Sequence, residues 1–264
     1  YPPLFKDLVN YIPYFDNEFV GKRVVITGAD GIIGRMLVEH FLAEGAIVCS
    51  SDTSADQLEG FAVSADLTTD LGLKKLLESV SEEWGAPHIV VNNAGIYPSS
   101  FLLDMRIEDW DQIMGVNVRA PFALMRGFSL QMIREEIKGS FVNISSGAAR
   151  KMRRTAVTYC MSKTALDRMS KGFALELAEY GIRVNCLEPG FAKGSSVSRL
   201  SEEHVEQVLS SIPLGGEIEK NDIGQAALYL ASSAARNITG TTLSVDGGNS
   251  AGTMDVYQEK KRAL

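Results

Sequence analysis

The sequence lacks the patterns that indicate a metalloprotein or a disulfide-stabilised protein. Only three cysteines occur in 264 residues, and Cys49, Cys160 and Cys186 show neither metal-ligand nor redox spacing. The three histidines are equally scattered, so metal chemistry has no support. An odd number of cysteines without a secretory signal predicts reduced thiols.

The sequence also lacks the features of membrane and nucleic-acid-binding proteins. No apolar run approaches the roughly eighteen residues of a membrane-spanning helix. The net charge is −7 and no long basic stripe occurs, which argues against nucleic acid or an anionic membrane as the main partner. The first twenty residues include Asp7, Asp16 and Glu18, unlike a signal peptide. We therefore expect a cytoplasmic protein.

What the sequence does contain is a regular alternation of strand and helix patterns. Hydrophobic residues make up 45% and charged residues 22% of the chain, as in ordinary globular proteins. The alternation predicts one α/β domain with a Rossmann-type, doubly wound parallel sheet and helices on both faces. The expected strands are 23–27, 46–51, 60–65, 88–92, 140–145, 182–187 and 241–245. The expected helices are 35–44, 69–84, 107–137, 156–180, 199–211 and 221–235.

Two segments stand apart from this alternation. Residues 1–20 form an amphipathic arm, because apolar residues recur there at helical spacing until Pro13. We expect the arm to pack on its own domain or on a neighbouring subunit, and covering the substrate pocket is the alternative. Residues 21–264 form the domain.

A glycine-rich turn follows the first expected strand. Its residues are Gly28, Ala29, Asp30, Gly31, Ile32, Ile33 and Gly34. Glycines allow a tight turn and the close approach of a pyrophosphate, whose charge is met by the free N–H groups of a helix N-terminus. The spacing differs from the G-x-G-x-x-G fingerprint, so a plain tight turn is the alternative.

Asp52 ends the second expected strand and predicts the choice of cofactor. It lies eighteen residues after Gly34, where a dinucleotide-binding fold places the acid that binds the adenosine ribose hydroxyls. A carboxylate accepts hydrogen bonds from two hydroxyls but repels a 2′-phosphate, and residues 45–60 contain no Lys or Arg. Asp30 adds to the repulsion. The sequence therefore predicts NAD rather than NADP, and a solvated turn residue is the alternative for Asp52.

Tyr159 and Lys163 form a possible acid–base pair. They are four residues apart in an expected helix, so they lie one turn apart on the same face. At roughly 4 Å and an effective dielectric of about 20, a unit charge is worth about 4 kcal/mol, against the ~1.4 kcal/mol that moves a pKa by one unit. We expect Lys163 to lower the pKa of Tyr159.

Other polar motifs follow the ends of the expected strands. Asn92-Asn93-Ala94-Gly95 follows the fourth strand, Ser145-Ser146 the fifth and Pro189-Gly190 the sixth. Because ligands bind at the carboxyl ends of strands in such a sheet, these segments are expected to meet in one crevice.

With these residues assembled, about residues 20 to 250 resemble the short-chain dehydrogenase/reductase family, compact subtype. Its motifs occur in order as Thr27-Gly28, Asp66-Leu67, Asn92-Asn93-Ala94-Gly95, Asn117, Ser146, Tyr159-x-x-x-Lys163, Pro189-Gly190 and Val245-Asp246-Gly247-Gly248. Ser146 lies thirteen residues before Tyr159, as the catalytic serine of the family does.

The resemblance implies an NAD-dependent oxidoreductase that interconverts a secondary alcohol and a ketone. Tyr159 would exchange a proton with the substrate oxygen while hydride moves to or from the nicotinamide. Lys163 would hold the nicotinamide ribose, Ser146 the substrate oxygen, and Asn117 a water that links Lys163 to solvent.

The resemblance also extends the set of cofactor-binding residues. Asp66 and Leu67 would flank the adenine, and Asn93, Ala94 and Gly95 would line the adenosine side. The full set is Gly28, Asp30, Gly31, Ile32, Ile33, Gly34, Asp52, Asp66, Leu67, Asn93, Ala94, Gly95, Tyr159, Lys163, Pro189 and Gly190.

The chain departs from the family pattern at three places. Its glycine turn reads T-G-x-x-G-x-x-G, the spacing of the extended members of the family. Gly194 stands where the family often has Thr, so Ser195 or Ser196 is expected to contact the carboxamide. The segment between Asp52 and the third strand is short, which predicts the loss of a helix there.

Two segments are candidates for substrate recognition. Arg150, Lys151, Arg153 and Arg154 fall between Ser146 and Tyr159, and Arg150 or Arg154 could hold an anionic substrate by bidentate hydrogen bonds. A solvated or subunit-contacting charge run is the alternative. Residues 191–215 resemble the variable substrate lid of the family.

Two other functions stay open on the sequence alone. The glycine turn is compatible with an epimerase or dehydratase that reduces NAD only transiently, and a dinucleotide fold is compatible with a regulator that has no activity. The resemblance further implies a homo-oligomer, a dimer or tetramer, built through the helices at 107–137 and 156–180.

Overall fold

A parallel sheet forms the centre of the structure, which is a computed structural model that describes residues 15–54, 56, 58, 60–192 and 202–254. In this part of the chain, seven strands pair in the order β3-β2-β1-β4-β5-β6-β7. They are β1 (Arg23–Thr27), β2 (Ile47–Asp52), β3 (Phe61–Ser64), β4 (Ile89–Asn92), β5 (Ser140–Ile144), β6 (Arg183–Pro189) and β7 (Thr242–Val245). All six pairings are parallel. The chain reverses its direction of winding between β1 and β4, the point where doubly wound folds bind ligands.

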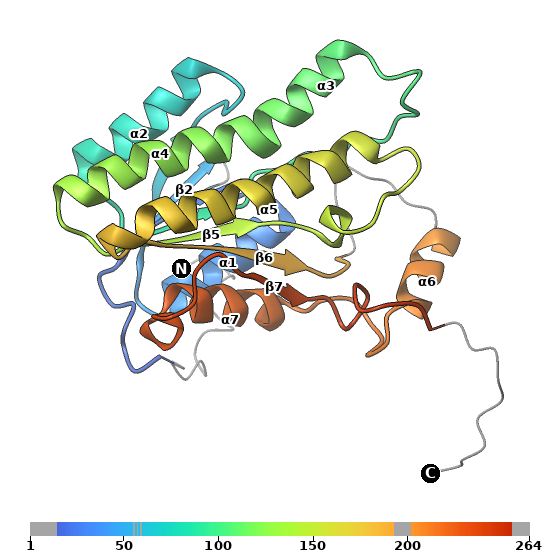
Figure 1. The fold of residues 1–264 in the computed structure, drawn as a ribbon. Coiled ribbons are helices and arrows are strands. Elements are labelled where there is room, and N and C mark those ends of the chain that lie inside the picture. The colour runs from blue at the N-terminus through green and yellow to red at the C-terminus, as the bar shows by residue number, and fades with distance from the viewer. Residues whose placement is uncertain (1–14, 55, 57, 59, 193–201, 255–264) are drawn as a thin grey trace, which may run out of the picture.

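Helices cover both faces of this sheet (Figure 1). One face carries α1 (Ile32–Ala43) and α7 (Lys220–Ala231), and the other carries α2 (Asp70–Trp84), α4 (Ala120–Arg134) and α5 (Val157–Leu177). The strands are rich in β-branched residues and are buried on both sides, as in RVVIT of β1 and IVVN of β4. Two hydrophobic cores result, one beneath each helical layer. The predicted fold class is confirmed.

The helical region predicted at 107–137 is present, but its winding changes within it. The structure has α3 (Ile107–Met114), a five-residue π-helical turn at Gly115–Arg119, and then α4. A π-turn inserts one extra residue per turn and re-aims the side chains that follow it. Sequence periodicity does not show this change of winding, because the apolar residues continue through it.

Smaller differences concern the ends of elements. The first helix begins at Ile32 rather than at residue 35, because Gly31 already has the extended conformation of an N-cap. The sixth strand extends through Pro189, which pairs with Val245. No helix occurs in the described residues between Asp52 and Phe61, as the short segment predicted. The described helices include none that is long and apolar enough to span a membrane.

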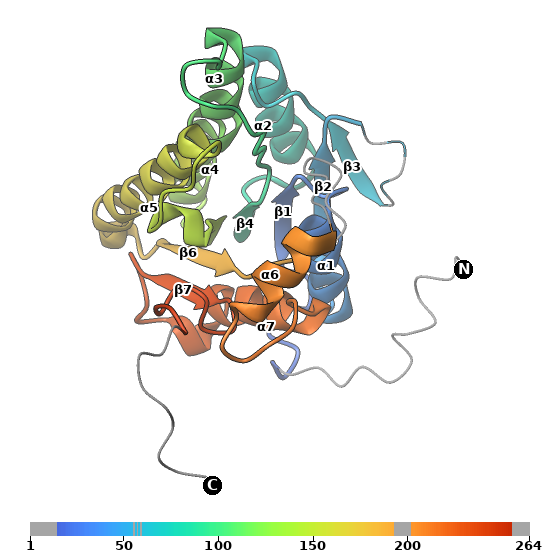
Figure 2. The ribbon, with the colours of Figure 1, turned by 90° about the vertical axis from the view of Figure 1, so that its right-hand side faces the viewer.

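The expected arm and lid fall partly outside the described residues. The helical spacing at residues 4–12 lies outside them, whereas Phe19 is buried with its ring 5.7 Å from that of Phe41. Gly194, Ser195 and Ser196 also lie outside. Within the expected lid, α6 (Glu202–Ser210) stands beside the carboxyl edge of the sheet, which faces the viewer in Figure 2.

Candidate active site

The glycine turn between β1 and α1 is packed so tightly that side chains are excluded. Gly28 has a φ of +63°, and a Cβ on it would lie 2.8 Å from the Cα of Ala94. A Cβ on Gly34 would lie only 2.0 Å from the carbonyl oxygen of Gly28. The first intrahelical bond runs from the Arg35 N–H to the Gly31 oxygen at 2.9 Å, so the preceding N–H groups lack acceptors within the helix. This is the backbone arrangement that receives a phosphate.

Asp52 lies beside this turn at the carboxyl end of β2. Its Oδ2 accepts a hydrogen bond from the Asp30 N–H at 3.0 Å, and its Oδ1 accepts one from the Thr53 N–H at 2.7 Å. The Asp30 carboxylate is paired with Arg35, at 2.5 Å between Oδ1 and Nη2. Sequence reasoning missed this pair because Arg35 lies before the segment searched for cations. Arg35 offsets the charge of Asp30, and Asp52 is left as the main source of repulsion.

The Asn93-Ala94-Gly95 segment holds the same turn from the side of β4. The Asn93 amide donates to the carbonyl oxygens of Thr27 and Gly28 at 3.0 and 2.9 Å. The backbone N–H groups of Asn93 and Ala94 both donate to Thr27 Oγ1 at 3.1 Å. A Cβ on Gly95 would lie 3.4 Å from Lys163 Nζ. The segment therefore joins the turn to the expected catalytic lysine.

Asp66 and Leu67 follow β3 and lead into α2. Asp66 Oδ1 accepts hydrogen bonds from the N–H and the hydroxyl of Thr68 at 2.9 and 2.7 Å, and these bonds hold the pKa of Asp66 below its usual value. Leu67 is buried.

Gly190 follows β6. It donates its N–H to the carbonyl oxygen of Val245 at 2.8 Å, and a Cβ on it would lie 2.8 Å from the Cα of Asp246.

Tyr159 and Lys163 lie on one face of α5, and Lys163 Nζ lies over the Tyr159 ring while bonding to a backbone oxygen. Lys163 is 4% exposed, and its Nζ donates to the carbonyl oxygen of Ile144 at 2.7 Å. It lies 5.8 Å from the centre of the Tyr159 ring. Ser146, in the segment after β5, accepts a hydrogen bond from the Ala148 N–H at 3.2 Å, and its interaction with Tyr159 acts to lower the pKa of the phenol.

The electrostatics of this pair are dominated by burial. Burial raises the pKa of Tyr159 above its usual value, while the interaction with Ser146 and the charge of Arg153 act in the opposite direction. The prediction that Lys163 makes the net shift downward is therefore wrong for this structure. Burial also lowers the pKa of Lys163 to about 8, against the charges of Cys186 and Asp167. At neutral pH the phenol keeps its proton.

Asn117 is directed to the site by the π-turn. Its Oδ1 accepts from the Ile96 N–H, and its Nδ2 donates to the Ile96 oxygen and to Ser162 Oγ, each at 2.9 Å. Ser162 in turn donates to the carbonyl oxygen of Tyr159 at 2.7 Å. Sequence reasoning missed Ser162, although it lies next to Lys163. Asn117 is thus tied to the helix that carries the tyrosine.

The basic loop 150–154 divides into different environments. Arg150 pairs with the fully buried Glu188 of β6, at 2.6 Å between Nη2 and Oε2, so its guanidinium already has an anionic partner within the protein. The guanidinium of Arg154 lies 5.8 Å from the centre of the Phe101 ring. Tyr97, which the sequence did not single out, has its ring 5.6 Å from that of Tyr159.

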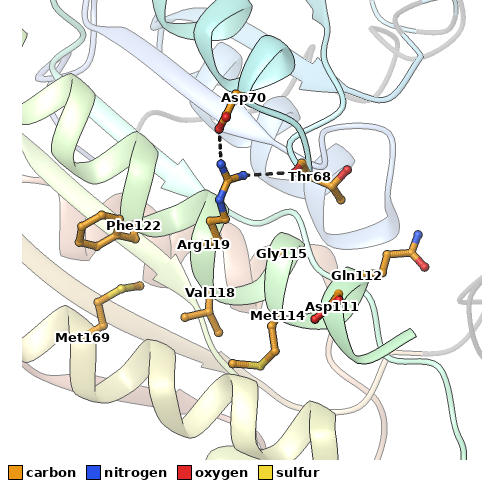
Figure 3. A pocket seen from close by; sticks show the side chains of 10 residues that line it. All are labelled: Thr68, Asp70, Asp111, Gln112, Met114, Gly115, Val118, Arg119, Phe122 and Met169. Atoms are coloured by element: carbon orange, nitrogen blue, oxygen red, sulfur yellow. Dashed lines mark hydrogen bonds and ion pairs between the residues drawn. The ribbon is translucent and has the colours of Figure 1, made fainter. Parts of the chain in front are cut away.

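A surface cavity of about 810 Å³ lies away from these groups. It is lined from Thr68 and Asp70 at the start of α2, from α3, the π-turn and α4, and from Met169 of α5 (Figure 3). Arg119 bridges Asp70 and the Thr68 carbonyl across one side of it. The cavity contains neither Tyr159 nor the glycine turn, so it is not the catalytic crevice.

The fold and this site define a nicotinamide-dependent oxidoreductase of the Rossmann type. A family model described as enoyl-(acyl carrier protein) reductase matches residues 28–250. A 3-oxoacyl-[acyl-carrier-protein] reductase of Thermotoga maritima is 33% identical over 240 residues, which cover 86% of this chain and 97% of the relative. The chain belongs to the short-chain dehydrogenase/reductase family, whose members act on CH–OH groups or ketones.

Solved structures with similar folds carry both forms of the cofactor. A short-chain dehydrogenase of Leptospira borgpetersenii with bound NAD⁺ has a TM-score of 0.81 and 27% identity, covering 89% of this chain and 94% of its own. A putative NAD(P)-dependent gluconate 5-dehydrogenase of Beutenbergia cavernae with bound NADP has a TM-score of 0.83 and 28% identity, covering 89% and 99%. Similarity alone therefore leaves the choice of cofactor to the residues of this chain.

Proposed function

We propose that this protein is an NAD(H)-dependent oxidoreductase that interconverts a secondary alcohol and a ketone. The observation that carries the proposal is the joining of four groups around the start of α5. Ser146 interacts with the Tyr159 side chain and acts to lower its pKa. Lys163 is buried one turn further along, and Asn117 is tied to the same helix through Ser162.

The groups of this chain take distinct roles in the proposed reaction. Ser146 orients the substrate oxygen, and Tyr159 gives that oxygen a proton in reduction or takes one in oxidation. Lys163 supplies positive charge near the phenol, and Asn117 fixes the loop that carries Ile96 against α5. The nicotinamide, when bound, supplies or accepts the hydride.

The backbone around β1 fits a dinucleotide. The spaces that a Cβ on Gly28 or Gly34 would fill are occupied by backbone, and the N-terminus of α1 has unpaired N–H groups suited to a pyrophosphate. Asp52 is in place for the adenosine ribose, and Gly95 leaves room beside Lys163 for the nicotinamide ribose.

We assign the selection of NAD over NADP to Asp52. Its carboxylate is oriented by the N–H groups of Asp30 and Thr53 and has lone pairs left for two ribose hydroxyls. The experiment compares kcat/KM for NADH and NADPH in the wild type, Asp52→Ala and the neighbouring control Asp56→Ala. Asp52→Ala should reduce the preference for NADH at least about tenfold, and an unchanged preference contradicts the assignment.

The substrate is proposed to be polar or anionic, with Arg154 as the recognising residue. Arg154 belongs to the loop between Ser146 and Tyr159, and its guanidinium lies over the ring of Phe101. Arg150 of the same loop is instead paired with Glu188. Arg154→Ala should raise KM for carboxylated or phosphorylated substrates and leave neutral ones unchanged, with Lys151→Ala as the control. Equal effects on charged and neutral substrates contradict this part of the proposal. The panel should include a 3-oxoacyl-[acyl-carrier-protein], because the Thermotoga relative is named as a reductase of that substrate.

A homo-oligomer, with a tetramer as the expected state, is proposed to form through α4 and α5. Large apolar side chains are exposed on these helices, including Phe122 at 47%, Leu130 at 42% and Leu175 at 81%. The cavity in Figure 3 opens beside Phe122 and Met169. Light scattering measures the mass directly, and Phe122→Asp should shift it toward the monomer.

The first experiment is cofactor turnover over a substrate panel in the wild type and Tyr159→Phe. Net NADH formation or consumption that is lost in the variant supports the oxidoreductase. Product formation without net NADH change would instead indicate an epimerase or dehydratase. Tight NADH binding without any turnover would indicate a regulator.

A further inference from the structure

Three consecutive residues at the carboxyl end of β5 interact with three side chains of α5, two of them through hydrogen bonds. The pairs are Ile144 with Lys163, Ser145 with Asp167, and Ser146 with Tyr159. The α5 residues are spaced by four, so they lie on one helix face in successive turns. Of the three α5 side chains, Asp167 is the one that the proposed reaction does not use.

Asp167 joins α5 to two strands that are not neighbours. Its Oδ1 accepts a hydrogen bond from the Ser145 hydroxyl, and its Oδ2 accepts one from Thr242 Oγ1 at 3.4 Å. Ser145 follows β5 and Thr242 begins β7, and β6 lies between these strands. The carboxylate therefore spans β6 and fixes α5 over the sheet at the height of Lys163.

We propose that Asp167 is a positioning residue, which holds the Ser145-Ser146 segment against α5 and places a negative charge one helical turn from Lys163. This inference rests on the proposed function for its catalytic consequence. Its structural part stands on the three pairs alone.

The charge of Asp167 matters because Lys163 is buried. Burial lowers the pKa of Lys163 to about 8, and the charges of Cys186 on β6 and Asp167 on α5 act against this shift. The burial of Cys186 itself raises the pKa of its thiol to about 12, so that thiol is neutral near pH 8. Tyr159 is also neutral there, since its pKa is raised by burial. Asp167 is thus the carboxylate that counters the burial of Lys163.

The decisive experiment titrates the Lys163 side chain by NMR in protein with isotope-labelled lysine. The signal is assigned by its loss in Lys163→Arg. We expect Asp167→Asn to lower the pKa of Lys163 by about one unit and Asp167→Glu to restore most of the difference. Glu176→Gln is the matched control, because it removes the charge of an exposed carboxylate on the same helix. An unchanged titration in Asp167→Asn, or an equal shift in Glu176→Gln, overturns the proposal.

Kinetics then separate the charge of Asp167 from its hydrogen bonds. Asp167→Asn should lower kcat about tenfold while KM for NADH stays within about twofold. In a plot of kcat/KM for ketone reduction against pH, the fall at alkaline pH should move to lower pH in this variant. Ser145→Ala keeps the charge, so it should lower kcat without moving the alkaline fall. Equal thermal destabilisation of both variants with unchanged kcat and pH profile would reduce Asp167 to a structural residue and contradict the proposal.

The two proposals fail in different ways. If the wild type shows no turnover that Tyr159→Phe removes, the proposed function fails, and the NMR titration still decides the role of Asp167. If turnover is present and depends on Tyr159 but Asp167→Asn leaves the pKa of Lys163 unchanged, only the inference about Asp167 fails.

Discussion

The substitution Gly34→Ala tests whether the tight glycine turn is what this fold requires. Gly34 lies in the first turn of α1, and its added Cβ would lie 2.0 Å from the Gly28 oxygen and 2.8 Å from the Cα of Ala29. Since Cβ atoms do not approach within 3.0 Å of other atoms, the turn has to move by about 1 Å. Both obstructing atoms belong to the backbone, so no side chain can yield instead.

The expected magnitude is the difference between two opposing effects. Overpacking of this kind costs about 1–3 kcal/mol, whereas Ala in a helix gains about 1 kcal/mol over Gly. Because the 2.0 Å approach calls for the upper part of the overpacking range, we expect Gly34→Ala to lower the free energy of unfolding by up to about 2 kcal/mol. A 1 Å displacement of the phosphate-binding backbone should also weaken NADH binding at least about tenfold.

Gly172→Ala is the matched control for this prediction. Gly172 is an exposed position within α5, and no atom lies within 4 Å of its added Cβ. It should therefore stabilise the protein by about 1 kcal/mol and leave NADH binding unchanged. Urea unfolding and NADH fluorescence titration measure both quantities. If Gly34→Ala stabilises as Gly172→Ala does and binds NADH normally, the reasoning about the turn is wrong.

Three further substitutions test other parts of the structure. Burial, aided by neighbouring cations, lowers the pKa of His88 in the folded protein to about 4, from the usual 6.5. Between pH 6.5 and 4 the histidine is therefore protonated in the unfolded chain but not in the folded one. Stability is lost as pH falls through this range. Urea unfolding in His88→Gln should show this loss reduced by about 2 kcal/mol, and an identical pH dependence contradicts it. Arg150→Met leaves the carboxylate of Glu188 buried and unpaired and should cost about 3 kcal/mol, while the double variant with Glu188→Gln should recover most of that, which a double-mutant cycle measures. Asn117→Ala removes the hydrogen-bond partner of both the N–H and the carbonyl oxygen of Ile96. It should lower stability by about 2–4 kcal/mol in thermal unfolding. A change below about 1 kcal/mol would mean that other groups form hydrogen bonds with these two atoms.

The elements that sequence predicts well are those whose burial is decided locally. The centres of strands β1 and β4 are apolar runs, VVI and IVV, and a parallel sheet buries such runs on both faces. The doubly wound arrangement was expected because crossovers in parallel sheets are right-handed. Asn93 and Ser146 were expected at the same edge of the sheet because each follows the carboxyl end of a parallel strand.

The features that sequence did not predict depend on contacts between distant segments. The π-turn at Gly115–Arg119 ends two residues before Pro121, which has no N–H to donate to the preceding turn. The bonds of Asn117 to the loop after β4 also stabilise the turn, and the local sequence does not show them. The pairing of Arg150 with Glu188 joins residues 38 apart, so a basic run read as a substrate contact became partly an internal ion pair. Charge patterns alone do not show which member of a run finds a buried partner.

The protonation states of the site imply a pH dependence for the proposed reduction. The pKa of Tyr159 is raised and that of Lys163 is about 8, so at neutral pH both the phenol and the ammonium carry their protons, as ketone reduction requires. As pH rises through 8, Lys163 loses its charge before Tyr159 loses its proton. The kcat/KM for reduction should therefore be flat from about pH 6 to 7.5 and fall with a limb near 8, while oxidation, which needs the phenolate, should continue to rise. If the reduction limb lies near the pKa of tyrosine instead, and is the same in Lys163→Arg, then Lys163 does not act through its charge.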